Sequence, residues 1–230
     1  MEKVIFDNMQ KMDYEIMEAY RALKMNLQFC GVDIKTILLT STTPEEGKSV
    51  VTMNLARSIA GFDQKVVYID CDIRRSMAVG RWGAHTRSGK SILGLSHYLS
   101  GQKKLEEIIY ETNINYLDVI FAGPNVPNPT ELLENIYFEK MLTCLREKYN
   151  VVLIDTPPLG SVIDAAVIAP KVDGAILVIE QGKVNRHYVK KVKKQLEKTN
   201  VKILGTILNK VSLKKNPYYG KYYMDKYQYK

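Results

Sequence analysis

The sequence has few cysteines and no long apolar segment. Its three cysteines, Cys30, Cys71 and Cys144, are odd in number and widely spaced in the 230 residues, and no CxxC pair occurs. This pattern argues against a disulfide framework or a cysteine zinc site and favours a reducing compartment. No apolar signal-peptide core follows the opening MEKVIFDNMQ, and no run of 18 apolar residues is present. We therefore expect a protein that is neither secreted nor membrane-spanning by itself.

Acidic residues are outnumbered by basic ones. The chain has 33 Lys and Arg against 25 Asp and Glu, which gives a formal net charge of +8. Much of the excess lies in residues 183–202, where eight basic residues accompany a single acid, Glu197. A solvated helix face explains this cluster, and so does attraction to an anionic membrane surface or a nucleic acid. Composition does not choose among these explanations.

Short apolar runs alternate with helical patterns along the chain. Six runs rich in Val, Ile and Leu predict strands that are buried on both faces. Residues 13–29, 48–60 and 185–198 space their apolar residues as helices do. This alternation predicts an α/β fold with a doubly wound, mostly parallel sheet flanked by helices. The predicted strands are residues 36–40, 66–69, 116–121, 151–154, 175–179 and 203–208.

A phosphate-binding loop is predicted where the first of these strands ends. Residues 41–49 read STTPEEGKS and lead into the predicted helix at 48–60. In this strand–loop–helix order, backbone N–H groups and the helix amino terminus hold phosphate oxygens. Lys48 is expected to reach the terminal phosphates, and the Ser49 hydroxyl is expected to bind Mg²⁺.

The loop departs from the strict P-loop pattern. Thr42 stands where GxxxxGK[ST] has its first glycine, so the structural context carries the prediction. A second Gly-Lys-Ser, at residues 89–91, follows no predicted strand and is interpreted as chance. After the last predicted strand, Asn209 is placed either to read a nucleotide base from the same crevice or to form a turn.

Carboxylates follow two of the predicted strands. Asp70 ends the run at 66–69 with Asp72 two residues further on, and Asp155 ends the run at 151–154. Because open α/β sheets bind ligands outside the carboxyl ends of their strands, the three acids can face one crevice. An apolar strand that closes on Asp is the Walker B arrangement, which holds Mg²⁺. An isolated Asp is more often a cap or a turn residue, but three acids beside a phosphate loop favour a site.

The carboxyl end of the sequence is unusually rich in tyrosine. Residues 217–230 contain six of the 15 tyrosines, no Ile, Leu or Val, and no clear period. We expect residues 1–212 to form the P-loop domain and residues 213–230 to be a mobile tail. The tail tyrosines are either phosphate acceptors or an aromatic segment that docks on a partner. The candidate acceptors are Tyr218, Tyr219, Tyr222, Tyr223, Tyr227 and Tyr229.

A family resemblance runs through nearly the whole chain. The segments that carry it, besides the tyrosine cluster, are EAYRALKMNLQF (18–29), TSTTPEEGKSVVTMNLA (40–56), VVYIDCDIRRS (66–76), GLSHYLSG (94–101), AGPNVPNPTELL (122–133), YNVVLIDTPP (149–158) and VDGAILVIEQGKVNR (172–186). They resemble the bacterial tyrosine kinases (BY-kinases) of capsule and exopolysaccharide synthesis, in their separate cytoplasmic form. The resemblance implies a P-loop NTPase fold with Walker A, extra Walker and Walker B motifs.

The resemblance also implies a role for each matching residue. Asp70 would accept the tyrosine proton, and Asn209 would contact the adenine. The implied catalytic residues are Lys48, Asp70 and Asp72. The implied ATP-binding residues are Gly47, Lys48, Ser49, Val50 and Asn209. The implied Mg²⁺ ligands are Ser49, Asp72 and Asp155, and the residues of an implied subunit interface are Glu18, Arg21 and Lys24.

The function implied by the resemblance is that of an ATP-dependent protein-tyrosine autokinase. It would phosphorylate its tail tyrosines in trans within a homo-oligomeric ring and regulate polysaccharide synthesis and export. The implied partners are a transmembrane activator of the polysaccharide co-polymerase type and a cognate tyrosine phosphatase, and no nucleic acid is expected. The implied location is the cytoplasm, with recruitment by the activator to the inner face of the membrane.

Three residues depart from the family pattern. Glu45 replaces a common glycine and places a second acid beside Glu46, so ATP affinity should suffer unless both side chains point outward. Lys24 stands where the interface motif usually has Arg, and Lys loses the bidentate geometry of a guanidinium. Ser76 stands where Pro is common.

Two other functions stay open at this point. A partitioning or cell-division ATPase of the same P-loop group needs no tyrosine tail, but it usually has a second lysine where this chain has Thr43. A non-catalytic, nucleotide-gated scaffold is the other alternative. The absence of HRD, DFG and APE triplets excludes the eukaryotic kinase mechanism.

Overall fold

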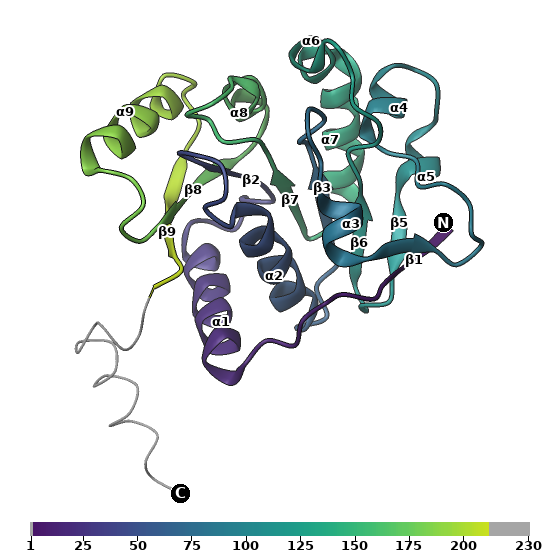
Figure 1. The fold of residues 1–230 in the computed structure, drawn as a ribbon, viewed down its shortest axis with the longest axis horizontal. Coiled ribbons are helices and arrows are strands. Elements are labelled where there is room, and N and C mark those ends of the chain that lie inside the picture. Colours follow the sequence, from purple (N-terminus) through teal and green to yellow (C-terminus); the bar gives the residue numbers. More distant parts are fainter. Residues whose placement is uncertain (1, 212–230) are drawn as a thin grey trace, which may run out of the picture.

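The six apolar runs form neighbouring parallel strands of one sheet. The computed structural model describes residues 2–211. The runs correspond to β2 (Thr36–Ser41), β3 (Val66–Asp70), β6 (Leu117–Ile120), β7 (Val151–Asp155), β8 (Gly174–Glu180) and β9 (Ile203–Asn209). Their order across the sheet is β6-β3-β7-β2-β8-β9. Because the chain winds from β2 toward both sides, the predicted doubly wound, mostly parallel sheet is confirmed (Figure 1).

Three short strands that the sequence did not predict extend the sheet beyond β6. They are β1 (Glu2–Phe6), β4 (Ala84–Thr86) and β5 (Tyr110–Thr112), in the order β4-β1-β5. β4 is antiparallel to β1, and β5 is antiparallel to β6, so this edge is mixed. β4 and β5 have three residues each, which is too short for a periodic signal.

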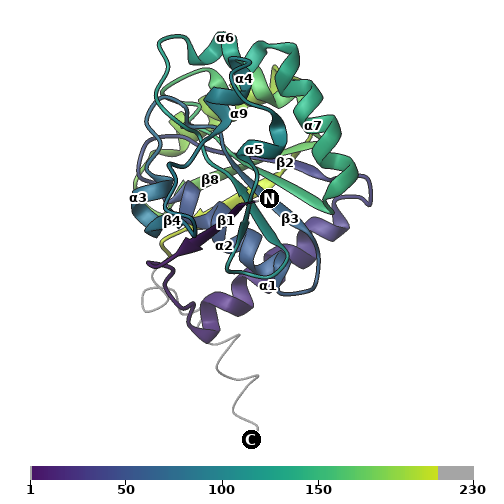
Figure 2. The same ribbon diagram turned by 90° about the vertical axis from the view of Figure 1, so that its right-hand side faces the viewer.

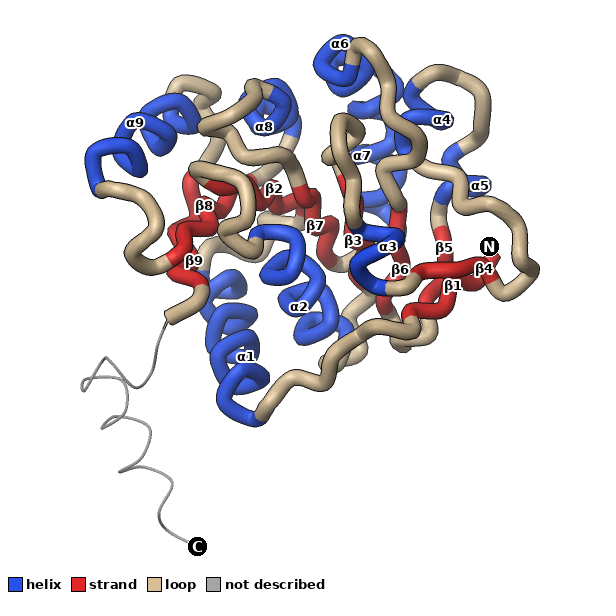
Figure 3. The backbone as a smooth tube through the Cα atoms, viewed as in Figure 1, coloured by secondary structure: helices blue, strands red, loops and turns tan. Residues whose placement is uncertain are grey.

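Helices cover both faces of the sheet (Figure 2, Figure 3). One face packs against α1 (Tyr14–Phe29), α2 (Lys48–Ala60) and α3 (Ala78–Trp82). On the other face lie α4 (Leu95–Leu99), α5 (Leu105–Ile108), α6 (Pro129–Glu134), α7 (Ile136–Lys148), α8 (Asp164–Ile168), the 3₁₀ turn Ala169–Lys171 and α9 (Arg186–Glu197). The helices predicted at 13–29, 48–60 and 185–198 are therefore confirmed to within about one residue at each end.

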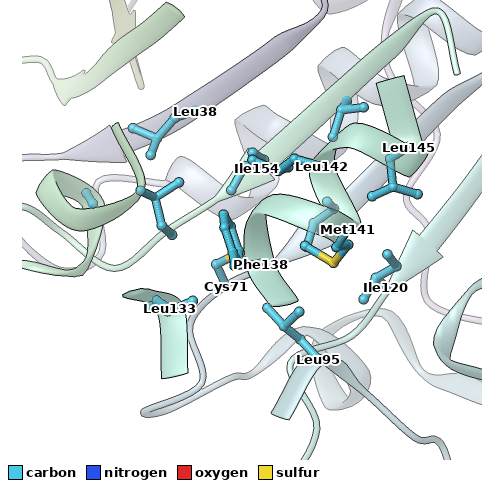
Figure 4. Close-up of a cluster of buried hydrophobic side chains, with 14 of the residues drawn as sticks. Leu38, Cys71, Leu95, Ile120, Leu133, Phe138, Met141, Leu142, Leu145 and Ile154 are labelled. Atoms are coloured by element: carbon cyan, nitrogen blue, oxygen red, sulfur yellow. The ribbon is translucent and has the colours of Figure 1, made fainter. Parts of the chain in front are cut away.

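Successive strand residues enter two separate cores. In β2, Leu38 packs on the side of α7 and α8, whereas Ile37 and Leu39 pack on the side of α2. Figure 4 shows the first core, where Phe138 and Met141 of α7 meet the sheet. With apolar residues on both faces, the central strands must be apolar throughout, as the sequence indicated. Among residues 2–211, no helix is long and apolar enough to cross a bilayer.

Candidate active site

The loop after β2 joins a strand to the amino end of a helix, as a phosphate-binding loop does. It leads into α2, whose first residue is Lys48 and whose N-cap is Gly47, with a φ of 82°. A side chain at Gly47 would place its Cβ 2.2 Å from Nδ2 of Asn209. The left-handed backbone therefore favours glycine here, and a side chain would displace that of Asn209. The predicted strand–loop–helix arrangement is confirmed.

The loop lysine and the Walker B carboxylate lie together in the interior. Nζ of Lys48 is 2.6 Å from Oδ1 of Asp155 and 3.3 Å from Oγ of Ser49. Only 8% of Lys48 and 1% of Asp155 are exposed. The Tyr68 hydroxyl donates a hydrogen bond of 2.9 Å to Oδ2 of Asp155. A buried cation is thus held at the amino end of α2, where it can meet an anion.

Asp70 lies beside this pair, because β3 and β7 place Asp70 opposite Asp155 in the sheet. Its carboxylate is buried and accepts hydrogen bonds from the Ser76 hydroxyl at 2.5 Å and from the Asp72 amide at 3.0 Å. Burial, and secondarily the neighbouring Asp155 carboxylate, raises the pKa of Asp70 to about 7. A carboxyl group with such a pKa can accept a proton near neutral pH.

Asp72 is partly buried, and its carboxylate has a local partner. Oδ1 of Asp72 accepts a hydrogen bond of 3.0 Å from the Arg75 amide, as a turn-forming Asp does. Arg74 forms a bidentate ion pair with the buried Asp164 of α8 and also donates to Thr130 of α6. These contacts fix the loop after β3 against two helices, and neither Arg74 nor Asp164 was predicted from the sequence to have such a role.

Glu46 braces the loop from inside. Its Oε2 accepts hydrogen bonds of 2.7–2.8 Å from the amides of Thr42 and Thr43 and from the Thr42 hydroxyl. Its Oε1 accepts a longer bond from the amide of Glu180. Glu46 is 1% exposed, so it does not point outward, yet its charge is satisfied by the base of the loop. Apart from the presence of an acid next to Gly47, no feature of the sequence indicated this role.

Glu45 is exposed and has a φ of 66°, a left-handed conformation that favours glycine. Two lysines donate to the backbone of this part of the loop. Lys210 binds the Glu45 carbonyl at 2.9 Å, and Lys183 binds the Pro44 carbonyl at 2.7 Å. Both lysines also pair with Glu180 at the end of β8. Lys183, which follows β8, and Lys210, which follows β9, therefore hold the outer side of the loop in place.

Asn209 contacts the loop at the end of β9. Its Nδ2 donates a hydrogen bond of 2.8 Å to the Glu46 carbonyl. The six candidate acceptor tyrosines, by contrast, lie outside the described residues, as does the whole segment predicted to be a tail, residues 213–230.

The residues predicted to form a subunit interface lie on α1 and differ in exposure. Glu18 and Arg21 form an ion pair with each other, and the Arg21 side chain is half exposed. Lys24 is buried, and its Nζ lies 3.4 Å from the ring centroid of Phe62, which follows α2. Lys24 thus joins α1 to the body of its own domain through a cation–π contact.

The residues present fit Mg²⁺ bound together with phosphate. In residues 2–211, no cluster of three or more His, Cys, Asp or Glu side chains is arranged to hold a metal alone. Mg²⁺ usually takes one or two carboxylates and completes its shell with phosphate and water. Ser49 and Asp155, which both contact Lys48, provide a hydroxyl and a carboxylate of that kind.

Beside the site a cavity of about 430 Å³ opens next to Ser76. Phe121 and Ile92 supply apolar walls, and Lys90 of the second Gly-Lys-Ser lies at its lining. No helix begins at residues 89–91, which confirms that this tripeptide is not a phosphate loop. Ser76, which lines the cavity, also donates a hydrogen bond to the buried Asp70 carboxylate.

Comparison with known proteins agrees with this geometry. The family model described as "AAA domain" matches residues 34–211. The chain is 44% identical over 195 residues to the tyrosine-protein kinase CpsD of Streptococcus agalactiae, covering 85% of this chain and 82% of that protein. Its structure is similar to the kinase domain of the Escherichia coli tyrosine kinase ETK, with a TM-score of 0.77, 33% identity and coverage of 86% and 78%. It also resembles the septum site-determining protein MinD of Pyrococcus horikoshii complexed with Mg-ADP, with a TM-score of 0.64, 25% identity and coverage of 76% and 70%.

Proposed function

The chain belongs to the bacterial protein-tyrosine kinase (BY-kinase) family, and we propose that it phosphorylates the tyrosines of its own carboxyl-terminal segment in trans. It is a protein-tyrosine kinase with a P-loop fold. The observation that carries the proposal is the buried Lys48–Asp155 pair with Asp70 directly beside it. Lys48, the cation that would bind phosphate, and Asp70, the carboxylate that would accept the phenol proton, thus lie close together.

In the proposed reaction, ATP is the phosphoryl donor and the chain's own groups position it. The loop amides and the amino end of α2 bind phosphate oxygens, with Gly47, Ser49 and Val50 in the first turn. Lys48 neutralises charge on the transferring phosphoryl group. Asn209, which contacts the loop, is assigned to the adenine. Bound Mg²⁺, held by Ser49, Asp72 and Asp155, would supply further charge neutralisation.

Asp70 is assigned to the acceptor. The tyrosine phenol enters through the cavity beside Ser76 and gives its proton to Asp70 as its oxygen bonds to the γ-phosphorus, while the bond from that phosphorus to the bridging oxygen breaks and ADP leaves. The apolar walls supplied by Phe121 and Ile92 suit an aromatic ring. Asp72 helps to hold the metal, and the Arg74–Asp164 ion pair keeps the loop that carries both acids in place. Most of the catalysis is positioning and charge stabilisation.

The acceptors in this proposal belong to a neighbouring copy in a ring. Glu18 and Arg21, which remain accessible on α1, would contact the next subunit. Lys24 supports this surface from below through Phe62. Residues 1–212 would form the kinase domain and residues 213–230 the acceptor tail.

The biological setting that we propose is control of capsular or exopolysaccharide synthesis and export. The kinase would act in the cytoplasm and be recruited to the inner face of the membrane by a transmembrane activator of the polysaccharide co-polymerase type. A cognate tyrosine phosphatase would reverse its modification. The support for this setting is the similarity to CpsD.

One reaction separates the autokinase from an ATPase and from a scaffold. The purified chain is incubated with Mg-ATP, and phosphotyrosine and free phosphate are both measured. We expect phosphotyrosine to accumulate, with more of it when a cytoplasmic fragment of the activator is added. Phosphate release stimulated by DNA or lipid without phosphotyrosine would favour the partitioning ATPase. ATP-dependent assembly without either product would favour the scaffold, and phosphate on serine alone would refute the proposal.

A further inference from the structure

α9 presents a basic face to solvent. All eight basic side chains of residues 183–202 are exposed. Lys193 pairs with Glu197, the one acid of this segment. The side chains without any hydrogen bond or ion pair to another part of residues 2–211 are Arg186, Lys190, Lys191, Lys194 and Lys198. This face is therefore an unneutralised positive surface.

The arrangement of these charges destabilises α9. Lys190, Lys194 and Lys198 follow one another at intervals of four, which places like charges side by side on the helix. Arg186 is the first residue of α9, and the first turn contains no acid, so positive charge lies at the positive end of the helix dipole. A bound anion would relieve both costs.

The apolar residues of α9 do not account for its exposed basic face. Val192 and Leu196 of α9 are buried in the core, and Tyr188 and Val189 pack against it. None of the large exposed apolar side chains among residues 2–211 belongs to α9. Helices that lie in a membrane interface insert apolar residues such as Trp, Phe and Leu, and α9 has none to offer. The surface is thus suited to a multivalent anion bound from water by charge.

The described part of the chain ends beside the turn that leads from β8 to α9. β9 ends at Asn209, which is paired with Glu180 at the end of β8, and the Gln181 amide binds the Asn209 carbonyl at 3.0 Å. α9 begins a few residues later, and Figure 1 shows α9 and β9 on the same side of the molecule. Residues 212–230 can extend over about 60 Å, whereas the twelve residues of α9 span about 18 Å. The segment is long enough to follow the whole helix.

Phosphorylation would reverse the charge of this segment. Residues 212–230 contain five Lys and one Asp, which gives a side-chain charge of +4 before modification. The unmodified segment is therefore repelled by α9. Each phosphotyrosine adds about −1.5 to −2, so three of them add about −4.5 to −6 and make the segment net negative.

We propose that residues 212–230, once they carry three or more phosphotyrosines, bind the basic face of α9. The inference rests on the proposed function, because phosphotyrosine in this segment is the product of that reaction. Phosphorylation then converts repulsion into attraction, and the modified segment is held on α9 and withdrawn from the transfer site. The ligand class that the face recognises is a multiply phosphorylated, extended peptide.

A synthetic peptide tests the inference without the kinase reaction. An amidated, fluorescent peptide of residues 212–230 with six phosphotyrosines is titrated with the full chain, which has been freed of phosphate and receives no nucleotide. We expect it to bind at least about tenfold more tightly than the unphosphorylated peptide, and less tightly as salt rises. The double substitution Lys190→Glu/Lys194→Glu should weaken binding about tenfold. The matched pair Lys140→Glu/Lys148→Glu on α7 should leave it unchanged, with helix content checked by circular dichroism in each variant.

Two results would overturn the inference. One is equal binding of the two peptides, and the other is phosphopeptide binding that survives Lys190→Glu/Lys194→Glu in a folded chain. Binding of phosphatidylserine vesicles through Lys190 and Lys194, with no phosphopeptide binding, would assign the face to a membrane instead. Because the peptide is phosphorylated by synthesis, a chain that never makes phosphotyrosine can still bind it, so failure of the proposed function is seen separately.

Discussion

Replacing Lys48 with Met is expected to reduce phosphotyrosine formation to below about 1% of wild type. The ammonium group of Lys48 is a buried cation that pairs with Asp155 at the amino end of α2. Methionine has no charge, so the transferring phosphoryl group would lose the cation that neutralises it. Losing a preorganised charge of this kind typically costs about 10²–10³ in rate. Phosphotyrosine is measured after incubation with Mg-ATP, and nucleotide binding is measured by titration.

A folding control is needed for this variant, because Lys48→Met leaves the Asp155 carboxylate buried without its cation. The double substitution Lys48→Met/Asp155→Asn removes both charges and should restore stability toward wild type without restoring activity. If the Lys48→Met chain is folded and still labels itself at the wild-type rate, Lys48 has no role in transfer and the site has been misassigned.

Replacing Asp70 with Asn is expected to lower the rate of tyrosine phosphorylation about 10²–10³-fold while the affinity for Mg-ATP changes less than about threefold. Asparagine keeps the size of the buried side chain and can still accept the hydrogen bond from Ser76, but it cannot take the phenol proton. The measurement is the initial rate of phosphotyrosine formation at saturating Mg-ATP, together with the dissociation constant of the nucleotide.

Asp118→Asn is a matched control for this change. Asp118 is a partly buried acid that, like Asp70, accepts a hydrogen bond from one hydroxyl, that of Tyr149, but it lies within β6, away from the phosphate loop. It should leave the rate unchanged. A rate for Asp70→Asn that equals wild type would show that Asp70 is structural. A large loss of nucleotide affinity would instead assign it to ATP or metal binding.

The central sheet was predictable because each of its strands carries its own signal. Parallel strands that are buried on both faces must be apolar throughout, so residues such as 151–154 stand out in the sequence. α2 and α9 were predictable from the spacing of their apolar residues. β1, β4 and β5 were not, since they owe their existence to pairing with distant partners rather than to a local pattern.

The candidate site, like the fold, was predictable from the sequence only in part. Lys48, Asp70 and Asp155 could be placed together because strand ends of a parallel sheet meet at one edge. The contacts that tune them could not, because they join residues far apart in the chain. The spacing of residues in the sequence predicts neither the hydrogen bonds from the loop to Glu46 nor the hydrogen bond from Tyr68 to Asp155.

Phosphoryl transfer between two inactive variants of the chain is the most direct test of phosphorylation in trans by this site. The Lys48→Met chain keeps its tyrosines but lacks the phosphate cation. A second chain with Phe at all six tail positions, 218, 219, 222, 223, 227 and 229, keeps the site but lacks the acceptors. The two are mixed with Mg-ATP, and phosphate is located by mass spectrometry. We expect phosphotyrosine in residues 212–230 of the Lys48→Met chain only. A mixture that stays unlabelled, or carries phosphate only elsewhere, while wild type labels its tail would contradict transfer between subunits by this site.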